Sequence, residues 1–265
     1  MSFFSVSNLI AGYKRTPVIN GVSFELEPGS LLGILGANGS GKTTLLKAMC
    51  GILPHEGSCV LEKTALEGLS PGKIARLCSY IPQRSGISID ISALDVVLMG
   101  FNPRLGLLER PGWDMRQKAL EALSQVGLKG LEQANYLHLS EGQKQLCILA
   151  RTLITDGKLL FLDEPESALD VRFRFRILEI LKSWLEKKPR AAMVTLHDPA
   201  LALNACSQLL LLSKGRVQAI LRPDTDPLEH LERQLASIYG PVTLQRCKDR
   251  RGETHLVMLK ERENL

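Results

Sequence analysis

The sequence predicts an open α/β fold with a mostly parallel sheet, and three features carry this prediction. Residues 31–35 are almost uniformly apolar, which is typical of a strand buried on both faces. Two further apolar strands, at residues 159–162 and 193–196, each run directly into polar residues. Between residues 91 and 153 the pattern changes to the spacing of helices. Polar groups at the carboxyl ends of such strands are how open α/β sheets build their sites.

Composition places the chain among ordinary folded proteins. Hydrophobic residues make up 45% and charged residues 23% of its 265 residues, which argues against a disordered or fibrous chain. At about 150 residues per domain, this length predicts one large domain with an appendage, or two lobes. The net charge of +5 suits an anionic ligand, a lipid surface or nucleic acid equally well, so the sign alone decides nothing.

The cysteines and the N-terminus favour a reducing, cytosolic compartment. The six cysteines are scattered singly, with no paired spacing typical of zinc sites or disulfide frameworks, so we expect reduced core residues. The four histidines other than His197 also show no ligand spacing, so no protein-held transition metal is expected. The first residues lack the pattern of a signal peptide, and no apolar stretch has the length of a membrane span.

Smaller elements follow from local patterns. Alternating residues predict a strand at 22–27, followed by a turn at Pro28 and Gly29. Asp114 and Gln117 form a possible capping box ahead of a helix. The remaining expectations are a helix at 43–50, a hairpin from 209–212 to 217–220, a linker at 223–227, and a small helix-and-strand appendage from 228 to 265.

A glycine-rich segment follows the buried strand at 31–35 and leads into a helix. It matches the P-loop pattern and consists of Gly36, Ala37, Asn38, Gly39, Ser40, Gly41, Lys42, Thr43 and Thr44. Glycines let backbone N–H groups wrap phosphates, Lys42 neutralises them, and the Thr43 hydroxyl is suited to Mg²⁺. A structural glycine turn is the alternative, and the strand and helix on either side argue against it.

A second motif ends the strand at 159–162 with Asp163 and Glu164. This pair fits a metal-facing Asp163 and a water-activating Glu164. Taken alone, the pair fits a solvated acidic loop about as well. The P-loop changes that balance, because hydrolysis of a magnesium nucleotide requires such carboxylates.

A third motif begins a helix at Ser140. Ser140 and Gln143 form an S-x-x-Q capping box before apolar residues at helical spacing. A well-capped helix with no further role explains this segment if nothing else supports a function. Its position between the other motifs is what gives it significance.

Taken in order, these motifs resemble the nucleotide-binding subunit of an ATP-binding cassette (ABC) transporter. Gln83 lies where that family has its Q-loop glutamine, and residues 139–143 match the signature sequence. Residues 167–170, ending in Asp170, match the D-loop, and His197 matches the switch histidine. Tyr13 matches the aromatic residue that stacks on adenine. His197 also ends a buried strand just before a predicted Asp198 cap with proline at the first helical position.

The resemblance implies a fold and a division of the chain. The fold is a P-loop NTPase core of ABC ATPase type, with an antiparallel β subdomain and an inserted helical subdomain. Residues 1–222 would form the ABC ATPase domain, with the helical subdomain inserted at about 84–157. Residues 223–265 would form a small C-terminal α/β extension.

The resemblance also implies the site. ATP would bind with Mg²⁺ held by Thr43, Gln83 and Asp163, while Glu164, His197 and Gln83 act in hydrolysis. The nucleotide would contact Tyr13 and the P-loop, and a second copy arranged head to tail would supply Ser140, Gly142, Gln143 and Asp170. A helix start at the signature offers unpaired N–H groups and a partial positive charge to the γ-phosphate.

Residues 98–108 and the segment around 238–242 resemble ATPases of importers for iron-siderophores, haem, cobalamin and related metal chelates. The implied partners are transmembrane permease subunits and, indirectly, a substrate-binding protein. The implied location is the cytoplasmic side of the inner membrane, reached through the permease. A soluble ABC ATPase in assembly or regulation is the competing hypothesis, and a module that binds nucleotide without turnover is a third.

Two further features of the sequence are an arginine-rich segment and a departure from the family signature. Arginines alternate with apolar residues at 171–176, which in isolation resembles a nucleic-acid-binding strand. Apolar residues continue at helical spacing, so we expect an amphipathic helix and no nucleic-acid partner. Glu141 replaces a glycine of the family signature, and we expect its carboxylate to point away from the nucleotide and pair with a basic residue.

Overall fold

The computed structural model describes residues 2–14, 16–83, 86–106, 108–165 and 170–261. Its centre is a six-stranded sheet in the order β10-β9-β3-β8-β7-β6. Strands β3, β6, β7, β8 and β9 run parallel, and β10 pairs antiparallel with β9. In chain order these strands are β3 (Leu31–Leu35), β6 (Cys78–Ile81), β7 (Leu159–Leu162), β8 (Ala191–Thr195), β9 (Gln208–Ser213) and β10 (Arg216–Leu221).

The three strands predicted from uniform apolarity are confirmed. Every residue of β3, β7 and β8 is buried, as expected for strands covered on both faces. The hairpin predicted near residues 209–220 is also confirmed as β9 and β10.

A second, antiparallel sheet lies beside the first, in the order β2-β1-β4-β5. Its strands are β1 (Phe4–Tyr13), β2 (Thr16–Leu26), β4 (His55–Leu61) and β5 (Thr64–Ala65). The strand expected at 22–27 is the last part of the longer β2. Gly21, with φ of 71°, lies at a register shift against β1, so the alternation of buried and exposed side chains starts afresh after it.

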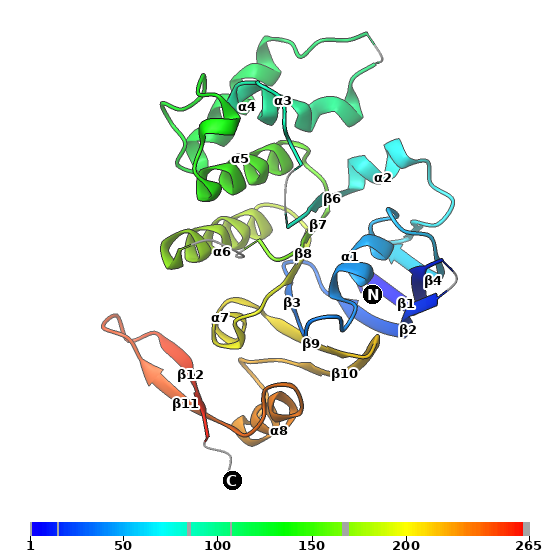
Figure 1. The fold of residues 1–265 in the computed structure, drawn as a ribbon, viewed down its shortest axis with the longest axis vertical. Coiled ribbons are helices and arrows are strands. Elements are labelled where there is room, and N and C mark those ends of the chain that lie inside the picture. The colour runs from blue at the N-terminus through cyan, green and yellow to red at the C-terminus, as the bar shows by residue number, and fades with distance from the viewer. Residues whose placement is uncertain (1, 15, 84–85, 107, 166–169, 262–265) are drawn as a thin grey trace.

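Some helices pack on the sheets, and others lie at the two ends of the molecule. In Figure 1, α3, α4 and α5 gather at one end, while α8 and the strands β11 and β12 lie at the other. The helices are α1 (Lys42–Met49), α2 (Pro71–Leu77), α3 (Ala93–Leu98), α4 (Trp113–Gln125), α5 (Glu141–Ile154), α6 (Val171–Glu186), α7 (Pro199–Ala205) and α8 (Leu228–Tyr239), with 3₁₀ turns at Met99–Arg104 and Tyr136–His138.

Helix caps agree with the sequence in two cases and differ in one. Ser140 and Gln143 form the predicted capping box of α5, and Asp198 caps α7 by accepting from the backbone N–H groups of Ala200 and Leu201. The capping box expected at Asp114 is wrong. Helix α4 begins two residues earlier than predicted, with Gly112 as its N-cap, which places Asp114 in the first turn, where a carboxylate favours the helix dipole.

Helix α6 confirms the amphipathic prediction for the arginine-rich segment. Its buried face consists of Ile177, Leu178, Leu181, Trp184 and Leu185, and the arginines near its start form part of the polar face. The cysteine prediction holds for five residues and fails for Cys247, which is exposed on β11. β11 belongs to a two-stranded sheet, and the burial that the core strands provide is absent there.

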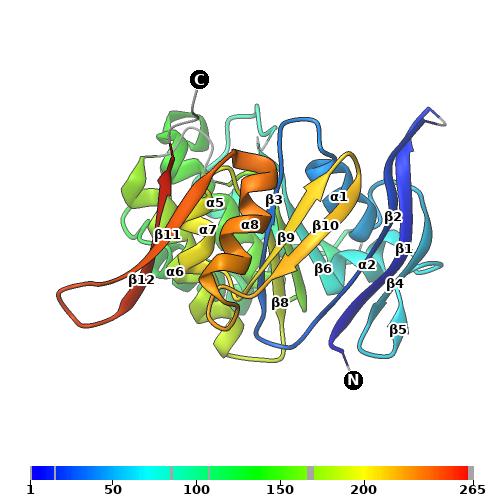
Figure 2. The same ribbon diagram turned by 90° about the horizontal axis from the view of Figure 1, so that it is seen from below.

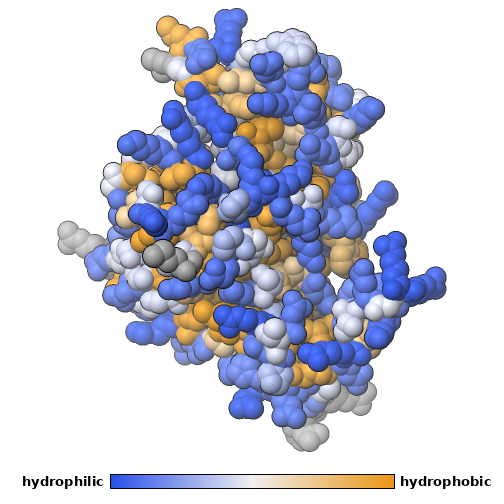
Figure 3. All heavy atoms as spheres, turned by 180° about the vertical axis from the view of Figure 1, so that it is seen from behind, coloured by the Kyte–Doolittle hydropathy of each residue, from blue (hydrophilic) through white to orange (hydrophobic). Residues whose placement is uncertain are grey.

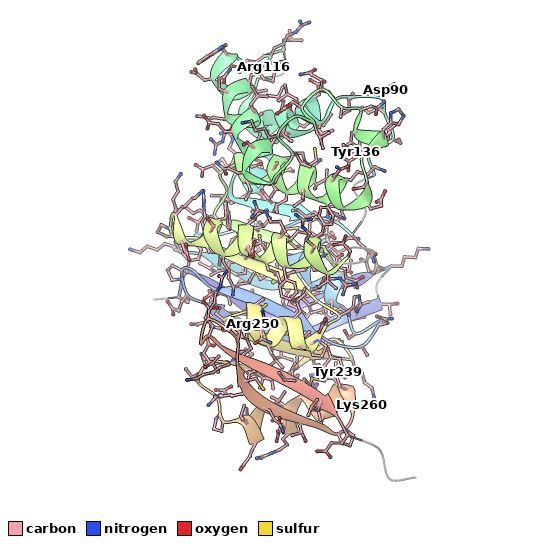
Figure 4. The ribbon with its side chains drawn as sticks, turned by 90° about the vertical axis from the view of Figure 1, so that its left-hand side faces the viewer. Asp90, Arg116, Tyr136, Tyr239, Arg250 and Lys260 are labelled. Atoms are coloured by element: carbon pink, nitrogen blue, oxygen red, sulfur yellow. The ribbon has the colours of Figure 1, made fainter. Side chains whose placement is uncertain are left out.

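The C-terminal segment packs against the main sheet's helices. It contains α8 and the hairpin of β11 (Val242–Lys248) and β12 (Thr254–Lys260). Figure 2 shows α8 in front of the sheet and the hairpin beside α7, and in Figure 4 Arg250 lies at the turn of this hairpin while Lys260 lies at its other end. The expected linker at 223–227 is an ordered turn, in which the Arg222 backbone N–H donates to the Asp226 carboxylate at 2.8 Å.

Polar and charged residues cover much of the face opposite to that of Figure 1, with apolar residues in smaller groups between them (Figure 3). Among the described residues, no helix combines the length and apolarity needed to cross a membrane.

Asn204 on α7 joins the hairpin to the rest of the molecule. Its side-chain amide donates to the Leu256 carbonyl at 2.8 Å, and its side-chain oxygen accepts from the Leu256 backbone N–H at 2.8 Å. We expect Asn204→Ala to lose both hydrogen bonds to Leu256 and a third to the Ala200 carbonyl, of about 1 kcal/mol each, and to speed amide exchange in β12 before the central strands. Asn204→Asp keeps the acceptor and should lose about half of that protection. Uniform exchange changes across the central sheet would contradict this role.

Candidate nucleotide-binding site

The predicted P-loop connects β3 to α1, and its backbone requires glycine at two places. Gly41 caps α1 with φ of 106°, a left-handed conformation that side chains rarely adopt. A Cβ at Gly36 would lie 2.3 Å from the Leu212 carbonyl oxygen, so only glycine fits beside β9. The loop therefore presents backbone N–H groups at the start of a helix, where anions are favoured.

Lys42 turns its ammonium group back toward the loop. The Nζ atom donates to the Gly36 carbonyl at 2.9 Å and to the Ala37 carbonyl at 3.4 Å. Burial lowers the pKa of Lys42, and the nearby carboxylates of Glu164 and Asp163 oppose that shift. The lysine is held without an ion-pair partner within hydrogen-bonding distance among the described residues, so its charge is available to phosphate oxygens.

A hollow of about 320 Å³ opens over this loop. It is lined by Tyr13, Val18, Asn38, Gly39, Ser40, Gly41, Lys42, Thr43, Thr44 and Glu164. The Ser40 hydroxyl is buried and has no hydrogen-bond partner among the described residues. Backbone donors, a cation and an unpaired hydroxyl around one hollow fit the oxygens of a nucleotide's phosphates.

Asp163 is the point at which three elements meet. One carboxylate oxygen, Oδ1, accepts from the Thr43 hydroxyl of α1 at 3.0 Å and from the Thr195 hydroxyl of β8 at 3.1 Å. The other oxygen, Oδ2, accepts from the Tyr80 hydroxyl of β6 at 3.0 Å. Thr43 and Asp163, the predicted metal ligands, therefore lie in direct contact, and hydroxyl and carboxylate oxygens suit Mg²⁺.

Burial raises the pKa of Tyr80, and the neighbouring Asp163 carboxylate raises it further. The phenol therefore stays protonated and acts as a donor to the carboxylate at all physiological pH values. The hydrogen bond from Tyr80 therefore holds the Oδ2 atom of Asp163 in one orientation.

Glu164 lies next to Asp163 in a left-handed backbone conformation, with φ of 48°. The Thr195 hydroxyl accepts from its backbone N–H at 2.7 Å, which holds this uncommon conformation in place. Its carboxylate accepts from the Gln83 side-chain amide at 2.7 Å and lies 2.7 Å from the His197 Nε2 atom. The structure thus brings together the three residues predicted to act in hydrolysis.

The signature residues occupy a different part of the chain. None of them is among the residues that line the hollow over the P-loop. The Ser140 backbone N–H donates to the Gln143 side-chain oxygen at 2.9 Å, and the Gln143 backbone N–H donates to the Ser140 hydroxyl oxygen at 3.3 Å. Glu141 forms an ion pair with Lys144 at 2.9 Å on the same helix. The expected pairing of Glu141 with a basic residue is therefore observed. That its carboxylate points away from a nucleotide bound to a second copy stays a prediction.

The D-loop prediction falls mostly outside the described residues, since only Asp170 of residues 167–170 is described. Asp170 caps α6, where its Oδ1 atom accepts from the Phe173 backbone N–H at 3.0 Å. A Cβ at Gly142 would lie 2.9 Å from the Phe173 ring, so the starts of α5 and α6 are packed together.

Sequence reasoning missed Tyr80 and Thr195. Each lies at or near the carboxyl end of a strand of the main sheet, the edge where the polar residues were expected, but a tyrosine or threonine on a buried strand is also common where it has no role in a site. The pairing register of β6 and β8 with β7 was the signal that could have found them. It sets Tyr80 opposite Phe161, and it sets Thr195 just beyond the last pair with β7.

A cavity of about 620 Å³ lies elsewhere, between α6, α7 and the C-terminal hairpin. It contains none of the predicted site residues. The groups that suit phosphate oxygens surround the smaller hollow over the P-loop instead.

A family model described as "ABC transporter" matches residues 19–167. The chain belongs to the ABC transporter ATPases, whose general activity is ATP hydrolysis. It is 32% identical over 241 residues to the iron chelatin transport ATP-binding protein of Helicobacter pylori, covering 88% of this chain and 91% of that protein.

Two more similarities extend this result. The chain is 36% identical over 229 residues to the hemin import ATP-binding protein HmuV of Jannaschia sp., covering 83% of this chain and 82% of that protein. A solved structure described as an inward-facing conformation of a metal-chelate type ABC transporter aligns with a TM-score of 0.82 and 27% identity, over 98% of this chain and 99% of that chain. The predicted fold class and family resemblance are confirmed.

The geometry makes Thr195 a positioning residue for both carboxylates. We expect Thr195→Val to leave the Glu164 N–H unpaired, to cost about 1–3 kcal/mol of unfolding free energy, and to slow turnover more than it weakens ATP binding. Thr195→Ser keeps the hydroxyl and should retain turnover. Steady-state hydrolysis and nucleotide titration of both variants measure this. Equal losses in the valine and serine variants would assign the effect to packing.

Proposed function

We propose that the chain is the ATP-hydrolysing subunit of an importer for a metal chelate of the iron-siderophore, haem or cobalamin type. The functions for which its relatives are named, iron chelatin transport and hemin import, support this cargo class. The contact of Glu164 with Gln83 and His197, beside the Thr43–Asp163 pair, is the observation that carries the catalytic part.

The P-loop amides, Ser40 and Lys42 would bind the phosphates, and Tyr13 at the rim of the hollow would stack on adenine. Thr43 and Asp163 would hold Mg²⁺, with the Gln83 side-chain oxygen as a further ligand. Bound magnesium neutralises charge that develops on the phosphate oxygens. Tyr80 and Thr195 keep the Asp163 oxygens aimed, since their hydroxyls donate to them.

Glu164 would orient a water molecule and accept its proton as the water oxygen bonds to the γ-phosphorus and the bond to the β-phosphate oxygen breaks. His197 would contact the γ-phosphate, and Gln83 would sense it. The side-chain hydrogen bond from Gln83 to Glu164 supports a direct link between sensing and the base. The retained carboxylate and histidine argue against a module that binds nucleotide without turnover.

A head-to-tail homodimer would complete each site. Ser140, Gly142, Gln143 and Asp170 do not line the hollow of their own chain, which supports their action on a nucleotide bound to a second copy. Glu141 is paired with Lys144, which reduces its repulsion of an incoming phosphate.

The proposed partners are transmembrane permease subunits and, through them, a substrate-binding protein. The subunit would lie on the cytoplasmic side of the inner membrane and be peripheral through the permease. We propose residues 1–222 as the ATPase domain, with the helical subdomain at about 84–157, and residues 223–265 as the extension. Gln83, just before this subdomain, would relay the state of the nucleotide to it.

We expect Glu164→Gln to retain ATP binding, to slow hydrolysis by at least about 100-fold, and to accumulate an ATP-bound dimer, because the general base is lost while the phosphate contacts remain. Nucleotide titration, phosphate release and size-exclusion chromatography with ATP measure these effects. Glu179→Gln, an exposed change on α6, is the matched control and should behave as the unmodified protein. Near-normal turnover in Glu164→Gln removes this residue from the role.

Transport and a soluble role in assembly or regulation give different results on purification from detergent-solubilised membranes. We expect a hydrophobic permease to copurify with the chain and to stimulate its ATP hydrolysis. Recovery of the chain only from the soluble fraction, with full activity and no membrane partner, would favour the soluble role.

A further inference from the structure

A cluster of three metal-ligating side chains lies in the antiparallel sheet, outside the nucleotide site. His55 begins β4, Cys59 lies within it, and Glu67 follows β5. Their ligand atoms all lie within 4.8 Å of one another. The chain turns back after β4 so that the Leu66 backbone N–H donates to the Cys59 carbonyl at 2.8 Å, which places Glu67 beside the thiol.

The hydrogen bond at the far side of the His55 ring determines which nitrogen faces the cluster. The Nδ1 atom lies 3.4 Å from the Leu53 carbonyl oxygen, and because a carbonyl only accepts, this contact favours the tautomer with a proton on Nδ1. The Nε2 atom faces the Glu67 Oε1 atom at 3.1 Å. A lone pair and a carboxylate at this distance require a cation between them, either a proton or a metal ion. Backbone carbonyls commonly orient metal-binding histidines in this manner.

The other two groups are equally constrained. The Glu67 carboxylate accepts from the Cys59 backbone N–H, which holds it within 4.8 Å of the Cys59 sulfur. The Cys59 side chain is completely buried, while Glu67 stays 31% exposed at its side chain. The cluster thus has one buried soft ligand and one ligand open to solvent. His55 also lies in the wall of a surface hollow of about 300 Å³, next to residues of β1 and β2.

The distances suit a tetrahedral ion. Zinc bonds of about 2.0–2.2 Å to nitrogen and oxygen imply roughly 3.4 Å between two such ligands, close to the separation of His55 and Glu67. Burial raises the pKa of Cys59 to about 12. Only a cation with high affinity for sulfur replaces the proton of such a thiol, which excludes Mg²⁺ and Ca²⁺ and favours zinc-like ions.

We propose that His55, Cys59 and Glu67 form a binding site for a thiophilic divalent transition-metal ion such as Zn²⁺, with water as the fourth ligand. The ion replaces the thiol proton of Cys59 and the proton between His55 and Glu67, and both protons pass to solvent. Bound metal links β4 to the segment after β5 and so stabilises this edge of the antiparallel sheet. The site is independent of nucleotide hydrolysis.

The full chain with Cys247→Ser is the reference protein for the test, because Cys247 is the exposed thiol among the described residues. Co²⁺ is the probe, since cobalt bound to a thiolate shows a charge-transfer band in the near ultraviolet. We expect this band in the reference protein, its displacement by Zn²⁺, and a Tm that rises with added Zn²⁺. Cys59→Ser should abolish the band, and His55→Gln and Glu67→Gln should each weaken cobalt affinity by at least about 10-fold.

The second His and carboxylate cluster of the chain, Asp249, Glu253 and His255, is the matched control, because it is more exposed and lacks a thiol. His255→Gln should leave the band and the affinity unchanged. Circular dichroism and retained ATP binding verify that each variant folds. If Cys59→Ser does not fold, Glu67→Gln still tests the site. An undiminished band in Cys59→Ser, or unchanged cobalt affinity in folded Glu67→Gln, would overturn the proposal.

Discussion

The Asp163 carboxylate receives hydroxyl donors from α1, β6 and β8 at once, and the rest of the site depends on this arrangement. Its side chain is almost fully buried, so the charge is stabilised mainly by these donors. The three donors come from segments far apart in sequence, which the parallel sheet brings to one edge. Any change that shifts one of these strands therefore moves the residues around the phosphates together with Glu164.

Much of this edge could be predicted from sequence, because its determinants are local. The apolar strands, the glycines between Gly36 and Gly41, and the capping box at Ser140 each depend on neighbouring residues, and the structure contains all of them. The roles of Gln83 and His197 beside Glu164 were implied only by the resemblance to a family, and the contacts among the three side chains were not predicted. Residues this far apart meet through strand order, which a local pattern does not encode.

The features that the sequence did not predict also depend on contacts that a local pattern does not encode. Tyr80 and Thr195 have ordinary places on buried strands, and only the register of β6, β7 and β8 turns their hydroxyls toward Asp163. The capping box predicted at Asp114 is absent because Gly112 is the N-cap, so Asp114 already lies inside the helix. Cys247 is exposed because its sheet has two strands, so residue type was a poor guide to burial there.

The capping box of α5 has a consequence for recognition at that helix start. The Ser140 oxygen accepts from the Gln143 backbone N–H, so the cap uses a lone pair and leaves the hydroxyl proton for donation. The side chain has already lost its rotational freedom on folding. An anion that approaches this end of α5 therefore meets a donor held in one orientation, and the entropy lost on contact is smaller than for a freely rotating serine.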